Sequence, residues 1–208
     1  MLHRSDLAFV ALFLALPGCA TPARRAADHA AAADWRTVVT DADRERLRDW
    51  RSDFARALEK ARAAGHGGEI DAEGRLLMPD AAIPGPLPNG DYRCRIVKLG
   101  ARGEGLLDYV AYPGFTCRVA QAGAVQYLSK LTGSQRPNGK IYRADAMRGV
   151  FLGMLVLGDE TRPMRYGSDT DRSLAGWVER VGPARWRIVF PAPHFESLTD
   201  VMELVPAS

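Results

Sequence analysis

A histidine and a glutamate near the C-terminus have the side chains and the spacing for acid–base chemistry. His194 and Glu196 flank Phe195 and would point to the same side of an extended chain, just after two prolines, Pro191 and Pro193. Such a pair can serve as general acid and general base, so both residues are catalytic candidates. The alternative is a packed connector before the last strand. No Gly-x-Ser-x-Gly motif accompanies the pair, so no nucleophile is identified.

A second group of polar side chains lies in a turn-rich stretch and suits ligand binding rather than catalysis. Loops at the mouth of a β-barrel commonly carry such groups, and an arginine there would bind a carboxylate or a phosphate. The alternative is an ordinary polar hairpin. A phosphate-binding loop is excluded because Ile141 stands where Ser or Thr would bind magnesium. The candidate ligand-binding residues are Thr132, Ser134, Gln135, Arg136 and Tyr142.

Metal and cofactor chemistry finds little support in the sequence. Beyond the N-terminal segment only His66 and His194 remain as histidines, too few nitrogen ligands for a zinc or iron site. His66 follows a predicted helix, where a histidine favours the negative end of the helix dipole. We therefore expect no metal site and no cofactor.

The N-terminus has the features of a bacterial lipoprotein signal. An apolar run over residues 7–18 is too short to span a bilayer, which needs about 20 residues, and it ends at Cys19. The residues before Cys19 resemble a lipobox, in which the cysteine is acylated and becomes the new N-terminus. The alternative is an ordinary secretory signal cleaved nearby. We expect a signal peptide over residues 1–18 and a flexible tether over 19–39. Because Ala20 and not Asp follows the cysteine, we also expect the protein at the outer membrane, facing the periplasm.

The number of cysteines is consistent with this predicted location outside the cytoplasm. Apart from Cys19, the chain has Cys94 and Cys117 alone, and one pair suits a disulfide in an oxidising compartment. The bridge would contribute about 3 kcal/mol in the chain-entropy model. Two free buried thiols are the alternative.

Composition predicts one globular domain over residues 40–208, helical at 40–78 and β at 90–206. The net charge is +3, and the 28 basic residues are interspersed with acids, which argues against nucleic acid as a partner. Nearly all basic residues are arginine. The four lysines are Lys60, Lys98, Lys130 and Lys140.

A helix is predicted to begin at Thr40, which forms a capping box with Asp43. Its apolar residues are spaced three or four apart and form one stripe, so the helix must cover an apolar surface. The stripe consists of Leu47, Trp50, Phe54, Leu58 and Ala61, and Gly65 ends the helix. A shorter helical stretch is predicted over residues 69–77.

From residue 92 onward the pattern changes to short runs that alternate with period two between turn residues. Residues 150–157 are apolar on both faces and indicate a central strand. Eight or nine strands at hairpin spacing favour a mainly β (α+β) fold, an antiparallel meander barrel or curled sheet of about eight strands preceded by the amphipathic helix. A two-sheet β-sandwich is the alternative.

Four segments together resemble a family of uncharacterised bacterial exported proteins, domain of unknown function 4893. They are GDYRCR at 90–95, LTGSQRP at 131–137, FLG at 151–153 and HFES at 194–197. The resemblance covers residues 40–206 and implies no activity, substrate or catalytic residue. It implies that Cys94 and Cys117 belong to a family pattern, consistent with a disulfide.

These observations predict a lipid-anchored cell-envelope protein whose β domain binds a small amphipathic ligand or an envelope protein. A structural or assembly factor is the first alternative. A hydrolase acting on envelope material, using His194 and Glu196 with Arg136, is the second. The expected contact with the membrane is through the N-terminal lipid.

Overall fold

The computed structural model describes residues 33–207; the predicted signal peptide and Cys19 lie outside the described residues. The helical part comprises η1 (Trp35–Thr37), α2 (Asp41–Ala63), α3 (Gly67–Glu73) and η2 (Gly74–Leu77). The predicted start of α2 is confirmed, because the Thr40 hydroxyl accepts a hydrogen bond from the Asp43 N–H at 3.2 Å. The predicted second helical stretch is present as α3 and η2.

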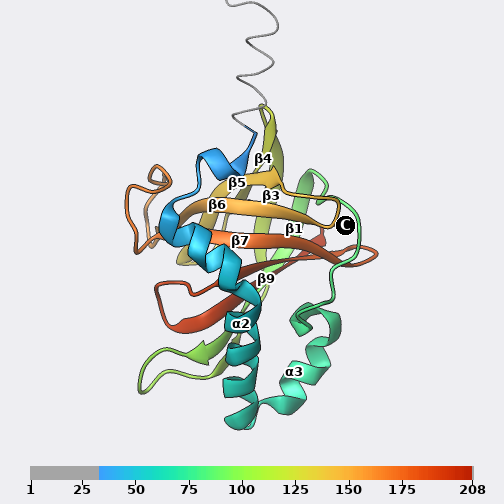
Figure 1. The fold of residues 1–208 in the computed structure, drawn as a ribbon, viewed down its shortest axis with the longest axis vertical. Coiled ribbons are helices and arrows are strands. Elements are labelled where there is room, and N and C mark those ends of the chain that lie inside the picture. Colours follow the sequence, from blue (N-terminus) through green and yellow to red (C-terminus); the bar gives the residue numbers. More distant parts are fainter. Residues whose placement is uncertain (1–32, 208) are drawn as a thin grey trace, which may run out of the picture.

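Nine antiparallel strands follow in a simple meander (Figure 1). They are β1 (Gly90–Ala101), β2 (Tyr109–Ala111), β3 (Phe115–Ala122), β4 (Val125–Lys130), β5 (Gln135–Arg143), β6 (Arg148–Leu157), β7 (Ser173–Gly182), β8 (Arg185–Pro191) and β9 (Ser197–Pro206). The last strand, β9, pairs with β1, from Tyr92↔Pro206 to Ala101↔Ser197, and this closes the sheet. The result is an eight-stranded barrel with β2 as an extra strand. The predicted barrel is confirmed, and the sandwich alternative is wrong.

The long first strand makes closure possible. The first half of β1 pairs with β3 through Cys94↔Phe115, and its second half pairs with β2 through Leu99↔Tyr109. The opposite edge of β1 pairs with β9 along nearly its whole length. β1 therefore has a neighbour on both sides, as a closed barrel requires.

Period-two alternation divides the strands into an inner and an outer face. Along β1, Tyr92, Cys94 and Ile96 point into the barrel core, whereas Val97 and Leu99 point outward under the helices. The strand β6 is buried on both faces, as predicted for residues 150–157, because its outer residues also meet the helical part.

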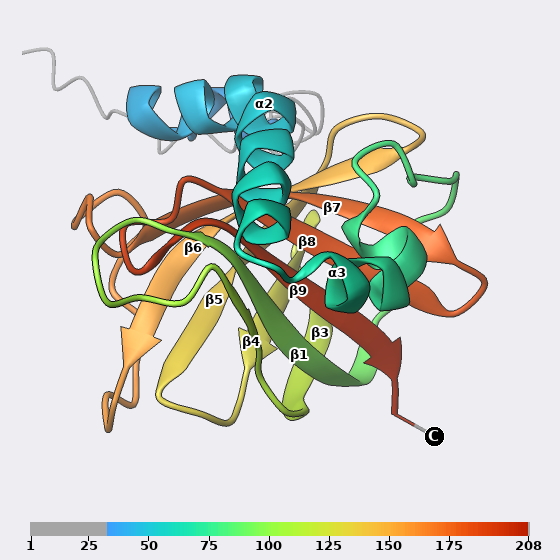
Figure 2. The ribbon, with the colours of Figure 1, turned by 90° about the horizontal axis from the view of Figure 1, so that it is seen from below.

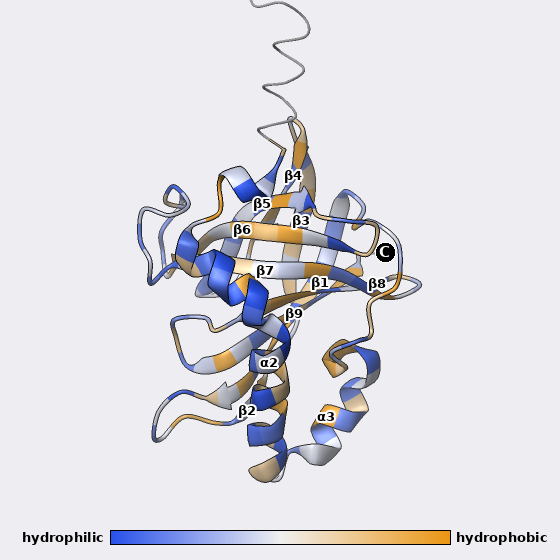
Figure 3. Cartoon of the chain, in the orientation of Figure 1, coloured by the Kyte–Doolittle hydropathy of each residue, from blue (hydrophilic) through white to orange (hydrophobic). Residues whose placement is uncertain are grey.

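The helix α2 covers the outer face of the barrel (Figures 1 and 2). Its predicted apolar stripe is buried throughout, with Phe54 at 0% exposure against the outward residues of β1, β8 and β9. The visible side of α2 is mainly hydrophilic, whereas the middle of β6 is hydrophobic (Figure 3). Before α2, Trp35 and Val39 are also buried, so the packed part of the chain begins earlier than the predicted boundary at residue 40.

The disulfide predicted between Cys94 and Cys117 is confirmed and lies inside the barrel. The two cysteines sit on the neighbouring strands β1 and β3, with Cα atoms 5.9 Å apart. Both are buried, at 2% and 0% exposure. The bridge therefore joins two inner positions and forms part of the core.

One strand is longer than the sequence predicted. We expected residues 132–139 to be a turn and only 140–142 to be a strand, whereas β5 begins at Gln135. Pro137 lies just beyond Asn138, where the pairing of β5 with β4 ends, so its missing N–H removes no bond on that side. A proline is tolerated in a strand at such a place.

Two aromatic rings fill the middle of the barrel because glycines face them. Phe151 and Phe190 meet edge to face with their centroids 5.4 Å apart. Gly139 of β5 is paired with Gly153 of β6, and a Cβ on Gly153 would lie 2.6 Å from the Phe151 ring. Side chains on these inner positions would occupy the volume that the rings need.

The substitution Gly153→Val is therefore expected to destabilise the barrel by about 3 kcal/mol or more, since overpacking a full core costs roughly 1–3 kcal/mol and here backbone atoms also clash. Urea unfolding followed by fluorescence measures the change. Gly114→Ala is the matched control, because nothing lies within 4 Å of a Cβ there. Equal stability of the two variants would contradict this description of the core.

Candidate functional site

Four connections lie at one end of the barrel, which we call the mouth. They are the loops at residues 102–108, 131–134, 158–172 and 192–196. In a meander, alternate connections fall at the same end, so segments that are far apart in the sequence meet there. The loops at 102–108 (green), 158–172 (orange) and 192–196 (red) lie side by side at the left of Figure 2.

A cavity of about 340 Å³ opens at the mouth. Its deep wall is apolar and includes Ile96, Leu155, Leu174 and Phe190 from four different strands. Its rim is polar and carries Lys98, Lys130, Ser134, Gln135, Asp171, His194, Glu196 and Asp200. Small-molecule sites have this composition, with a mainly apolar lining and a few convergent polar groups.

Three charged residues of the cavity occupy inward-facing strand positions. Lys98 follows Ile96 on the inner face of β1, and Lys130 follows Leu128 on β4. Asp200 precedes Met202 on β9 and is paired with Lys98 in the sheet register. Each is the inward position next to the mouth, so the barrel core changes there from apolar to charged.

Lys98 is held by two carboxylates. Its Nζ lies 3.1 Å from Asp200 Oδ2 and 3.2 Å from Glu196 Oε2, and its side chain is 7% exposed. Burial alone would lower the pKa of Lys98, but attraction to Asp200 and Glu196 outweighs it and raises that pKa. Ser197 donates a hydrogen bond to the other oxygen of Asp200. Burial raises the pKa of Asp200, although attraction to Lys98 opposes this shift. Lys98 is thus a buried lysine with two carboxylate partners.

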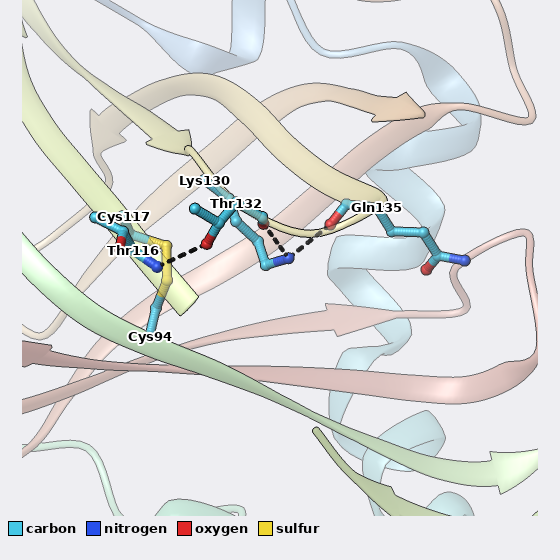
Figure 4. Close-up of a disulfide and its surroundings, with 6 residues drawn as sticks. All are labelled: Cys94, Thr116, Cys117, Lys130, Thr132 and Gln135. Carbon is cyan, nitrogen blue, oxygen red and sulfur yellow. Dashed lines mark hydrogen bonds between the residues drawn. A yellow bond between two sulfur atoms is a disulfide. The ribbon is translucent and has the colours of Figure 1, made fainter. Parts of the chain in front are cut away.

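Lys130 is equally buried but differs in its partners (Figure 4). Its Nζ donates to the backbone oxygens of Thr132 and Gln135, both at 2.9 Å, and lies 3.5 Å from the centre of the Phe115 ring. Within residues 33–207 it forms no ion pair with a carboxylate. Burial, together with repulsion from Arg136 and Lys98, lowers the pKa of Lys130 to about 8.

The loop at 192–196 is held in a strained conformation over the cavity. Ala192 and Glu196 have φ angles of 44° and 68°, and they are the described non-glycine residues with positive φ. The backbone oxygen of Glu196 accepts a hydrogen bond from Arg102 N at 2.9 Å, and its side chain accepts one from Gln135 at 3.2 Å. Strain of this kind costs about 1–3 kcal/mol and clusters at functional sites.

The catalytic candidates His194 and Glu196 both line the cavity, but they have different partners. His194 Nδ1 lies 3.2 Å from Asp171 Oδ1, whereas Glu196 contacts Lys98 and Gln135. In the described part of the chain, no hydroxyl or thiol forms a hydrogen bond with His194. Among the described residues, His194 therefore has a carboxylate partner and no hydroxyl or thiol partner.

The polar residues predicted as one cluster are separated in the structure. Ser134 and Gln135 line the cavity, and the Thr132 hydroxyl accepts a hydrogen bond from Thr116 N at its edge. Arg136 does not line it, because its guanidinium donates to the backbone oxygens of residues 133, 158 and 160 and ties two mouth loops together. Tyr142 is buried at the far end of β5, beside a second hollow of about 470 Å³.

Sequence reasoning missed Lys98, Lys130, Asp171 and Asp200. For Lys98, Lys130 and Asp200 the sequence contains a signal. Each is a charged residue at a position where the period-two alternation of its strand predicts an inward-facing apolar residue. Lys130 stands two residues after Leu128, and Lys98 two after Ile96. Their convergence depends on pairing between β1 and β9, about 100 residues apart, which alternation does not specify.

The fold and this site define a class, namely an eight-stranded meander barrel with a solvent-accessible cavity at one end. A family model for a domain of unknown function (DUF4893) matches residues 35–204, so the chain belongs to this family, as the sequence resemblance predicted. No curated protein and no solved structure matches the chain.

No helix within residues 33–207 is both long enough and apolar enough to cross a membrane. Nor do three or more His, Cys, Asp or Glu side chains gather there in a way that would hold a metal ion.

Replacing Lys98 should destabilise the protein strongly. Lys98→Met leaves Asp200 buried without its cation, and breaking a buried pair costs about 3–5 kcal/mol. Adding Asp200→Asn should restore part of the loss, because the uncompensated charge disappears. Denaturant unfolding gives both values. Lys140→Met, at an exposed lysine, is the control, and a Lys98→Met variant as stable as this control would refute the pairing.

Proposed function

We propose that this protein is a lipid-anchored cell-envelope module whose barrel binds a small amphipathic ligand at its mouth. The observation that carries the proposal is the mouth cavity, which combines an apolar wall with a charged rim. Its volume of about 340 Å³ lies within the range of roughly 300–1,000 Å³ that small-molecule sites occupy.

The ligand's apolar part lies in the depth of the cavity, against Leu155, Leu174 and Phe190. Its polar end lies at the rim, where Ser134, Gln135 and the charged side chains offer hydrogen bonds. The ring of Phe190, which meets the Phe151 ring edge to face, is part of the cavity wall. Such a site is formed in advance and rests on strands, which favours binding without a large rearrangement.

A second candidate is docking of the mouth on a partner surface, as in an assembly factor. Seven large apolar side chains of the described residues are exposed, and five of them belong to the mouth loops or adjoin them. These five are Leu106, Leu107, Tyr112, Leu131 and Met164. A hydrolase is disfavoured, because His194 lacks a nucleophile partner among the described residues.

The envelope address rests on the N-terminal sequence and on redox chemistry. Cys19 follows a lipoprotein-like signal. The buried bridge between Cys94 and Cys117 supports an oxidising compartment such as the periplasm, since disulfides persist there and are rare in the cytosol. The anchor would then hold the domain at the outer membrane, close to amphipathic molecules.

Binding is tested by thermal unfolding of the purified protein with decanoate and with 1-decanol. A ligand at about one hundred times its Kd stabilises the folded state by about 2.7 kcal/mol, which raises the Tm by roughly 5–10 °C. Ser134→Trp, at an exposed position on the rim, should block the cavity and remove this shift.

Thr161→Trp is the matched control, because Thr161 is also an exposed loop residue but does not line the cavity. The control should keep the full Tm shift. The proposal is wrong if no amphiphile shifts the Tm of the wild-type protein, or if Ser134→Trp binds as the control does.

The anchor has a separate test in mass spectrometry of membrane fractions. Wild-type protein should carry acyl chains on Cys19, and Cys19→Ser should appear in the soluble fraction without them, since stable anchoring takes two or more acyl chains. An unmodified Cys19 in the wild-type protein would overturn the anchoring proposal and leave the ligand site unaffected.

A further inference from the structure

Lys130 is the cation of the mouth cavity that the fold leaves without an anion. An ammonium group has three N–H donors. Two of them are used by the backbone oxygens of Thr132 and Gln135, and the ring of Phe115 covers another side. Within residues 33–207 no carboxylate pairs with it, although it is only 3% exposed and lines the cavity.

The other cations near the cavity already have their partners. Lys98 is bound by Asp200 and Glu196, and Arg136 donates to three backbone oxygens. The two lysines therefore form a natural contrast, since both are buried and line the same cavity but only Lys98 has carboxylate partners.

We propose that the ligand is an aliphatic carboxylate and that Lys130 binds its carboxylate group with the remaining N–H donor. This inference rests on the proposed ligand-binding function and specifies the chemical class of the ligand. A carboxylate only accepts hydrogen bonds, so it suits an ammonium group, which only donates them. A hydrogen bond between two charged groups is also stronger than one between neutral groups. The alkyl chain then extends toward Leu174 and Phe190.

The loop at residues 131–134 passes very close to the ammonium group of Lys130. Gly133 has a φ of +89°, and a Cβ there would lie 2.8 Å from Lys130 Nζ and 2.9 Å from the Phe115 ring. Glycine lets the chain turn tightly around the ammonium group. The backbone thus holds the ammonium group of Lys130 in place, and the residue lines the cavity.

The charged groups around Lys130 determine how binding depends on pH. They are Lys98 on β1, Arg136 on β5, Asp200 on β9, His194 and Glu196 in the loop at 192–196, and Asp171 before β7. Glu196 and Asp200 are held by Lys98, and Asp171 is exposed and bound to His194. Repulsion from Arg136 and Lys98 adds to burial in lowering the pKa of Lys130 to about 8.

A bound carboxylate favours the charged form of Lys130 and so raises its pKa. The free protein loses this proton as the pH rises through about 8, whereas the complex keeps it. Carboxylate binding is therefore strongest below pH 8 and takes up a proton above it. As long as the complex keeps the proton, the affinity falls by about eightfold between pH 8.5 and 9.5.

The experiment compares decanoate, 1-decanol and decylammonium by isothermal titration calorimetry on the purified protein at pH 7. Wild-type protein should bind decanoate at least tenfold more tightly than 1-decanol, and decylammonium least. Lys130→Met should weaken decanoate at least tenfold and leave 1-decanol within about twofold. Lys140→Met, the same change at an exposed lysine, should alter neither.

The same measurement on the wild-type protein at a series of pH values from 7 to 9.5 tests the inference without a variant. The affinity for decanoate should fall as the pH rises, whereas the affinity for 1-decanol should not change. If neither decanoate nor 1-decanol binds, the proposed function itself fails. If both bind but decanoate responds neither to pH nor to Lys130→Met, the cavity binds amphiphiles and the carboxylate inference is overturned.

Discussion

Closure of the sheet through β1 and β9 is the constraint on which the rest of the structure depends. Once β9 pairs with β1, every second residue of the eight strands points into one small interior. The side chains at these positions either pack together as an apolar core or line a cavity. Rings fill the middle, where Gly139 and Gly153 give Phe151 its volume. Toward the mouth three inner residues are charged, namely Lys98, Lys130 and Asp200, and a cavity lies beside them.

The same closure explains how charge comes to lie inside the barrel. Lys98 and Asp200 face each other across the β1–β9 pairing and neutralise one another, with Glu196 as a second anion. Lys130, on β4, makes its contacts with backbone oxygens and an aromatic ring instead of with a carboxylate. A buried cation with neutral partners is expensive for folding alone, which makes an arriving anion the natural complement.

Local signals in the sequence predicted the elements well. The Thr40 capping box and the stripe through Phe54 gave α2, and alternation gave most of the strands. Counting cysteines was sufficient to predict the bridge between Cys94 and Cys117. The predicted strand at residues 140–142 was shorter than β5, because Pro137 and its neighbours have the composition of a turn. Only their pairing with β6 makes them part of a strand.

The site could not be predicted in the same way, because it depends on the barrel register. Gln135 and Tyr142 are close in sequence, yet they lie at opposite ends of β5. The seven residue steps between them span roughly 23 Å, at about 3.3 Å per residue. Lys98, Lys130 and Asp200 are distant in sequence and meet only after closure. Alternation shows which way each side chain points and leaves open which ones meet.

The most direct measurement is a crystal structure of the protein with decanoate bound. A carboxylate oxygen about 3 Å from Lys130 Nζ, with the alkyl chain running into the mouth toward Phe190, is the predicted result. Decanoate bound elsewhere, or bound in the mouth with its carboxylate turned away from Lys130, would contradict the account.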